Sequence, residues 1–159
     1  MTGKTHLIGG LTAGIAVQYF TGHYTQDLLF LASCTAGSLL PDICHGGSKI
    51  GRKLPIISHL IRFLFGHRTV THSLLFMVIL GAILSSTPVP ASITAGIIIG
   101  MASHLLLDAA TARGIALLWP LTLKIRLPIY THTGGVIEHV VMALMIVATG
   151  YIGYQMYIF

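Results

Sequence analysis

Three of the four acidic residues of this chain, and several of its histidines, lie at the ends of apolar segments. Five such segments cover residues 7–20, 28–40, 73–87, 91–107 and 136–159. Only 8% of the 159 residues are charged, whereas an ordinary soluble domain carries about 25%. A small domain has too much surface for so few charges to cover. We therefore expect residues 1–159 to form one small multi-span membrane domain.

The apolar segments predict an all-α fold, a polytopic bundle of about five transmembrane helices. Segment 136–159 is long enough to span a bilayer with some tilt, because a span needs about 20 residues. The other segments are shorter and must recruit the polar residues at their ends. Small residues recur in them at spacings that let helices approach closely in lipid: Gly9, Gly10, Gly14, Gly37, Ser38, Gly96 and Gly100.

Lys and Arg residues set the expected orientation in the membrane. Lys4 precedes the first segment, and the other basic residues all lie in the stretches 42–71 and 109–135. The short connections 21–27 and 88–90 hold none. The positive-inside rule then places the N-terminus and both basic loops in the cytoplasm and the C-terminus outside a bacterial-type inner membrane. Within the first loop, residues 56–65 form an amphipathic stretch that we expect to lie at the membrane interface.

The net charge of +5 suits anionic lipid headgroups. Nucleic acid is not an expected partner, since apolar residues interrupt the basic loops.

On this topology nearly all the chemistry-bearing side chains share the cytoplasmic side. They are His6, Asp42, His45, His59, His67, His72, His104, Asp108, Glu138 and His139. His23 and Asp27 lie on the opposite side. An acid at the centre of a membrane helix costs about 2.5–3.5 kcal/mol on insertion, so such acids are usually paired, solvated or metal-bound. Three acids from three segments at one depth require cations, which indicates a metal site.

The sharpest local signal is the pair His104 and Asp108. Four residues are close to one helical turn, so the imidazole and the carboxylate share one face and can reach one cation. The same spacing is equally consistent with a hydrogen-bonded pair that holds no metal.

The other candidates are weaker when each is taken alone. His67 and His72 are five residues apart, a spacing that does not put both on one face of a straight helix, so His67 belongs to the loop and His72 to the helix start. Asp42 follows Pro41 where the second segment ends, which also suits a turn residue. Glu138 stands near a helix start, where the helix dipole favours any carboxylate. Their occurrence together is what favours a metal site.

Several motifs resemble the YdjM-type family of membrane-bound metal-dependent hydrolases. They are Thr5-His6, Gly37-Ser38-Leu39-Leu40-Pro41-Asp42, His67-Arg68-Thr69-Val70-Thr71-His72-Ser73, His104-Leu105-Leu106-Leu107-Asp108 and Leu117-Leu118-Trp119-Pro120. The resemblance implies an inner-membrane hydrolase distantly similar to zinc-dependent phospholipase C. By position it carries over the metal ligands His6, Asp42, His67, His72, His104, Asp108 and Glu138. Where the family often continues Pro-Asp-x-Asp-His, this chain has Cys44, which is either a soft ligand or the mark of an altered metal position.

The function expected from these observations is a phosphoesterase. Divalent ions, zinc above all and manganese or iron as alternatives, would activate water and stabilise the charge on a phosphate, and two or more ions would be bound. Asp42 or Glu138 would act as the base. Arg68, Arg113, Lys124 and Arg126 are placed to contact phosphate, although they serve equally well as topology determinants. A site at the membrane boundary suggests a phospholipid or another phosphorylated amphiphile as substrate.

Two other classes of protein remain as alternatives. A metal or proton transporter would also hold His and Asp inside a bundle, but it needs polar residues through to the other side, where the segments are nearly featureless. A non-catalytic protein with a structural metal site would need only four ligands. The larger number of candidates favours catalysis.

Overall fold

The computed structural model describes residues 1–22, 27–65, 69–121 and 123–158. Its elements are α1 (Gly3–Thr21), α2 (Leu28–Gly37), the 3-10 helix η1 (Leu40–Cys44), α3 (Lys49–Lys53), α4 (Pro55–Phe65), the 3-10 helix η2 (Val70–His72), α5 (Leu74–Ser85), α6 (Ala91–Ala109) and α7 (Val136–Ile158). Strands are absent from the described residues, which form only isolated bridges such as Thr111 with Thr131. The all-α prediction is confirmed, and each of the five apolar segments forms a helix.

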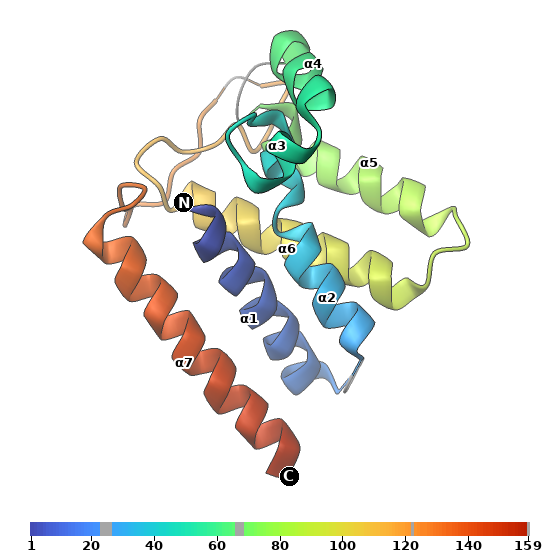
Figure 1. Cartoon of the computed structure of the whole chain (residues 1–159), viewed down its shortest axis with the longest axis vertical. Coiled ribbons are helices and arrows are strands. Elements are labelled where there is room, and N and C mark those ends of the chain that lie inside the picture. The colour runs from blue at the N-terminus through green and yellow to red at the C-terminus, as the bar shows by residue number, and fades with distance from the viewer. Residues whose placement is uncertain (23–26, 66–68, 122, 159) are drawn as a thin grey trace.

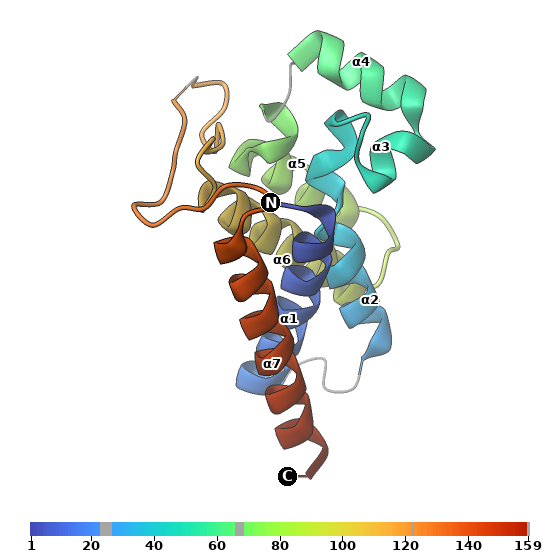
Figure 2. The same ribbon diagram turned by 60° about the vertical axis from the view of Figure 1, so that its left-hand side comes forward.

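Helix α6 lies at the centre of the bundle. It packs against α1, α2 and α5, and α7 packs against α1 (Figure 1). The beginnings of α1 and α7, the end of α6, and α3 and α4 all lie at one end, whereas the C-terminus lies at the other (Figures 1 and 2). The topology therefore brings five separate parts of the chain together at the end where sequence analysis expects the site.

The contact between α2 and α6 depends on glycine. A Cβ on Gly100 would come within 2.0 Å of the Cys34 carbonyl oxygen, and one on Gly37 within 2.4 Å of the Ile97 carbonyl oxygen. Only glycine lets the two backbones approach this closely, as in many membrane helix pairs. This confirms the packing role predicted for the small residues, and it fixes the height of His104, one turn beyond Gly100 on α6.

Side-chain caps define where two of the helices begin. Asp27 accepts a hydrogen bond from the Phe30 N–H at 3.1 Å at the start of α2, and Ser73 accepts one from the Phe76 N–H at 3.1 Å at the start of α5. Each cap satisfies a backbone donor that has no partner within its helix. Because Ser73 fixes the start of α5, the preceding turn η2 holds His72 at the end of the bundle.

Two further segments cover this end of the bundle. Residues 110–121 and 123–135 belong to a loop closed by backbone hydrogen bonds between Ile115 and Ile125, at 3.0 and 2.8 Å. Ile115 is buried and packs with Leu105 and Ala109 of α6. The loop and the α3–α4 segment stand on opposite sides of the N-terminus in Figure 2.

The stretch predicted to be amphipathic is helix α4. Ser58 on one face is buried, whereas Ile56 and Phe63 are 83% and 86% exposed. The helix thus presents large apolar side chains that nothing in the described chain covers.

Two helices in the described chain are long and apolar enough to cross a membrane, residues Ala91–Ala109 of α6 and Val136–Met156 of α7. Helix α5 and the segment Leu28–Cys44 are apolar but shorter. Only 6% of the apolar window in α7 is buried inside the protein. Its exposed surface is what a lipid-facing helix requires, because no polar face is available for water.

Candidate metal centre

Five of the predicted ligands converge at one end of the bundle: His6 of α1, Asp42 of η1, His72 of η2, and His104 and Asp108 of α6. The side chains of the four other than Asp42 are completely buried, and that of Asp42 is 16% exposed. Imidazoles and carboxylates are the ligands that zinc and related ions take. The structure thus gathers residues up to 102 positions apart in the sequence.

Asp42, His72 and His104 form one group in which a ligand atom of each residue lies within 4.8 Å of the others. His72 Nε2 lies 3.2 Å from His104 Nε2, 3.7 Å from Asp42 Oδ1 and 3.6 Å from Asp108 Oδ2. His104 Nε2 lies 3.9 Å from Asp42 Oδ1 and 3.7 Å from Asp108 Oδ2. Ligand atoms around a tetrahedral zinc ion are separated by about 3.3 Å, given bonds of about 2.0 Å. The donor set therefore fits a divalent ion with little rearrangement.

Asp108 faces two sides of the cluster. Its Oδ2 points to His72 and His104, whereas its Oδ1 lies 3.3 Å from His6 Nε2. His6, His104 and Asp108 make a second group with metal-ligand spacing. The N-terminal ammonium group of Met1 also contacts Asp108 Oδ1, so a positive charge already lies on this side. If two ions were bound, Asp108 would be placed to hold them both, and they would supply Lewis acidity at the site.

The other ring nitrogens of two histidines are held by hydrogen bonds. His104 Nδ1 donates to the Ser38 carbonyl oxygen at 2.6 Å, and His72 Nδ1 lies 3.1 Å from the Thr71 hydroxyl. A carbonyl can only accept, so His104 carries its proton on Nδ1 and its neutral ring presents a lone pair on Nε2. Such partners orient metal-binding histidines and set their tautomer.

His6 is the residue that the protein alone leaves least satisfied. Its side chain is completely buried, and apart from the 3.3 Å approach of Nε2 to Asp108 Oδ1 neither ring nitrogen has a hydrogen-bond partner among the described residues. Its ring stacks on His104 at 3.7 Å between centroids. Burying a polar ring without a partner is unfavourable. A cation beside Asp108 would provide that partner.

The charges of the cluster shift the acidity of the two residues outside the spanning helices. Burial lowers the pKa of His72, but its hydrogen bonds with Asp108 and Asp42 outweigh that effect and raise the pKa to about 10. Burial raises the pKa of Asp42, but the hydrogen bond with His72 and the charges of His104 and His6 bring it down to about 2. Without a metal, His72 is therefore the protonated member of the cluster at neutral pH, and Asp42 is ionised.

Glu138 has different surroundings. Its Oε1 accepts hydrogen bonds from the Thr2 N–H at 2.6 Å and the Thr5 hydroxyl at 2.5 Å, and its Oε2 accepts one from the Gly134 N–H at 2.7 Å. It belongs to neither group with metal-ligand spacing. The carboxylate joins the start of α7 to the start of α1.

The remaining predicted residues fall into three groups. His67 and Arg68 lie outside the described residues. Cys44 is buried, and its thiol donates to the Pro41 carbonyl oxygen at 3.6 Å and also interacts with the side chain of His72. Arg126 stacks on Tyr130, with its guanidinium 4.1 Å from the ring centroid.

A cavity of about 950 Å³ opens beside the cluster. Asp42 is the member of the cluster that lines it, and Glu138 lines it as well. Of the cations predicted to contact phosphate, Arg113 reaches this cavity. Lys4 and Arg52 also line it, although their positions in the sequence indicated only the orientation of the chain in the membrane. The one sequence feature that could have placed Lys4 at the cavity is its position two residues before the predicted ligand His6.

The fold and the cluster define the class of protein: an all-helical protein with a buried His and Asp centre at one end of its bundle. The chain belongs to the YdjM inner membrane protein family, whose family model matches residues 1–159. It is 49% identical over 157 residues to "Uncharacterized protein YvsG" of Bacillus subtilis (strain 168), covering 99% of this chain and 97% of that protein.

It is also 41% identical over 102 residues to "Inner membrane protein YdjM" of Escherichia coli (strain K12). That match covers 61% of this chain and 52% of the relative, about half its length. A relative from Shigella flexneri with the same description matches equally well. No solved structure is significantly similar. The predicted family membership is confirmed, and with it the inner-membrane character.

Proposed function

We propose that this protein is a membrane-embedded metal-dependent hydrolase that cleaves a phosphoester of a phospholipid or another phosphorylated amphiphile. The observation that carries the proposal is a pair of adjoining ligand groups that share His104, one with Asp42 and His72 and the other with His6 and Asp108. Asp108 Oδ2 also lies 3.6 Å from His72 Nε2. A buried set of this kind, next to a cavity, is the arrangement expected of a metal-assisted active site.

The cluster is closed on all sides except that of Asp42. The buried histidines and Asp108 would hold the ions, preferably zinc because nitrogen ligands predominate, with manganese or iron as alternatives. Bound ions supply Lewis acidity, which lowers the pKa of water and neutralises charge on a phosphoryl group. A structural zinc site would be expected to have no opening to a cavity.

Asp42 is the residue best placed to take a proton from the attacking water. Its carboxylate reaches the cavity and, with its pKa at about 2, is ionised at neutral pH. Glu138, the other predicted base, already accepts hydrogen bonds at both oxygens. Asp42 would therefore act at the boundary between the buried ions and the substrate.

The membrane arrangement that we propose has five spans: α1, α2, α5, α6 and α7. Helices α6 and α7 are long and apolar enough to span, and α1, α2 and α5 all pack directly on α6. The site end would face the cytoplasm, with α4 at the membrane surface. An alkaline phosphatase fusion after Ser86, between α5 and α6, should be active outside the cell, whereas a fusion at His132 should not. The reverse result would invert the topology.

The hydrolase proposal is tested by phosphate release from phosphorylated lipids in nanodiscs. Wild-type protein loaded with zinc, manganese or iron in turn is compared with Asp108→Asn and with Ser103→Ala, a control on the same helix. Release by wild type and Ser103→Ala, but not by Asp108→Asn, is expected. Metal binding without release from any lipid, while vesicles show metal flux, would favour a transporter instead.

A further inference from the structure

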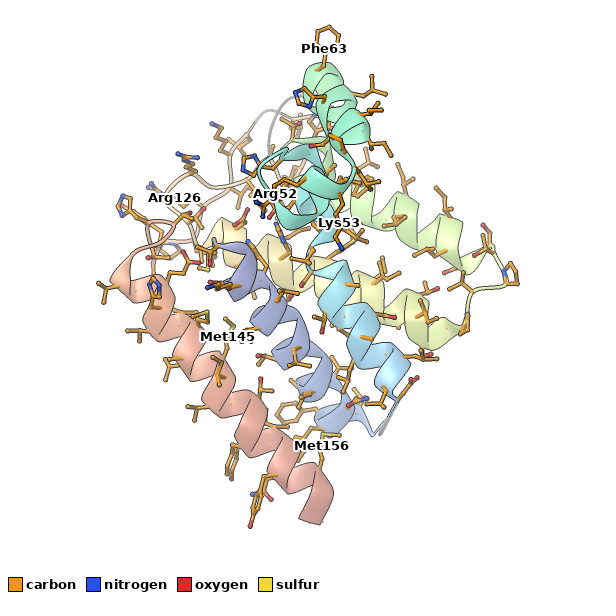
Figure 3. All side chains as sticks on the ribbon, viewed as in Figure 1. Arg52, Lys53, Phe63, Arg126, Met145 and Met156 are labelled. Atoms are coloured by element: carbon orange, nitrogen blue, oxygen red, sulfur yellow. The ribbon has the colours of Figure 1, made fainter. Side chains whose placement is uncertain are left out.

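Three cationic side chains converge on the cavity beside the metal cluster. Lys4 comes from the first turn of α1, Arg52 from α3, and Arg113 from the loop that follows α6. Arg52 lies at the end of the bundle where α1 begins, far from Met156 at the other end of α7 (Figure 3). The fold thus assembles positive charge from three distant parts of the sequence around one opening.

The acids of the chain are committed to other contacts. The chain has four. Asp27 caps α2, Asp42 and Asp108 face the histidines, and Glu138 accepts from Thr2, Thr5 and Gly134. The ion pairs found in the described part of the chain include none of the three cavity cations. All three cations are exposed, and an anion in the opening would be attracted by all of them at once.

The cavity also suits a headgroup in size and in its remaining donors. Ligand pockets usually measure about 300–1,000 Å³, and this cavity has about 950 Å³. His45, His132 and His139 line it and are exposed. Arg offers paired N–H groups to phosphate oxygens and Lys a point charge. The lining therefore supplies both charge and hydrogen-bond donors for an oxyanion.

We infer that Lys4, Arg52 and Arg113 form an anion-recognition site that binds the phosphate-bearing headgroup of the substrate beside the metal cluster. The inference rests on the proposed hydrolase for its biological role, but binding by the cations does not require metal. In this arrangement the cations hold the anionic headgroup at the opening, and Asp42 marks the path from the cavity to the ions. The cations thus select anionic over neutral headgroups.

The site can be tested on full-length protein in phosphatidylcholine nanodiscs after metal removal with a chelator. Calorimetric titrations with inorganic phosphate and with dihexanoyl phosphatidic acid compare wild type, Lys4→Gln, Arg52→Gln and Arg113→Gln. Lys53→Gln is the matched control, because Lys53 is exposed, neighbours Arg52 on α3 and does not line the cavity. We expect each cavity variant to bind about tenfold more weakly, as befits the loss of one charge-assisted contact, and Lys53→Gln to match wild type.

The two ligands distinguish the source of the anion. Equal affinities indicate recognition of phosphate alone, whereas tighter binding of phosphatidic acid with the same mutational pattern indicates a lipid headgroup; either supports the inference. Undetectable binding to wild type, or equal weakening by Lys53→Gln and Arg52→Gln, overturns it. Asp108→Asn separates the two proposals. If this variant and wild type both bind phosphate, but wild type hydrolyses no lipid, only the hydrolase proposal fails. If wild type hydrolyses lipid and Arg52→Gln is unaffected, only the anion site fails.

Discussion

Asp108 and Glu138 are both buried carboxylates at the same end of the bundle, yet their surroundings are opposite. Asp108 faces the Nε2 atoms of three imidazoles, from His6, His72 and His104. Glu138 faces N–H and O–H donors at both oxygens. A carboxylate surrounded by donors is satisfied by the protein itself, whereas imidazole lone pairs around a carboxylate require a proton or a metal ion. A carboxylate would thus be a ligand in the proposed metal centre, whereas in the other region it is an anchor between the starts of α1 and α7.

The largest expected effect contrasts these two acids directly. Asp108→Asn removes the carboxylate that faces both ligand groups, so metal measured by elemental mass spectrometry should fall to background. Glu138→Gln should retain the wild-type amount while lowering Tm, because the new amide N–H₂ group would face the Gly134 N–H. Each variant must first give a folded, monodisperse peak. Metal loss in folded Glu138→Gln would make Glu138 a ligand after all.

His6 and His72 sharpen the comparison within the Asp108 region. Each belongs to one of the two groups with metal-ligand spacing, whereas His104 belongs to both. His6→Ala and His72→Ala should therefore each reduce the number of bound ions without abolishing binding, and His104→Ala should impair both groups. The stoichiometry after equilibration with zinc decides the matter. If His6→Ala binds as many ions as wild type, the second group does not hold one.

The sequence predicted the features that depend on neighbouring residues, but not those that depend on contacts between distant parts of the chain. The helices followed from apolar segments, and the pairing of His104 with Asp108 followed from the pitch of one helix, because both are local. Residue types at segment ends also indicated a shared site for His6, Asp42 and His72. The three donors around Glu138 come from α1 and from the loop before α7, so no local pattern distinguished it from a ligand. Likewise, only the tertiary arrangement of α1, α3 and the loop after α6 brought Lys4, Arg52 and Arg113 to one cavity.

Metal removal is expected to lower the stability only of proteins that keep the Asp108 carboxylate. A ligand present at about 100 times its Kd adds about 2.7 kcal/mol to the free energy of unfolding, which for a chain of this size corresponds to about 5–10 °C in Tm. Chelation should lower Tm by this amount in wild type and in Glu138→Gln, but not in Asp108→Asn. A chelator effect of equal size in Asp108→Asn would place the stabilising ion elsewhere.

A substitution at Thr71 tests whether a hydrogen bond from a residue outside the cluster orients the ring of His72. Its hydroxyl lies 3.1 Å from His72 Nδ1, and both side chains are buried. Thr71→Val keeps the shape but removes the hydrogen bond, so His72 loses the partner that fixes its ring. Zinc affinity, measured by competition with a chelating dye, should fall about tenfold, the low end for such partners. An unchanged affinity would mean that packing alone orients His72.

Thr5 tests the anchor with the smallest change. Its hydroxyl donates to Glu138 Oε1 at 2.5 Å, while the Thr2 N–H still occupies the same oxygen. Thr5→Val should therefore lower the free energy of unfolding by about 1 kcal/mol, the net value of one hydrogen bond, and Tm by about 2–4 °C. The matched control is Thr35→Val, whose hydroxyl donates within α2 to the Leu31 carbonyl oxygen at 2.9 Å. Bound metal should stay at the wild-type level in both variants. A loss of metal in Thr5→Val would show that the anchor at Glu138 also positions His6, one residue further along α1, and the two regions would then be coupled rather than separate.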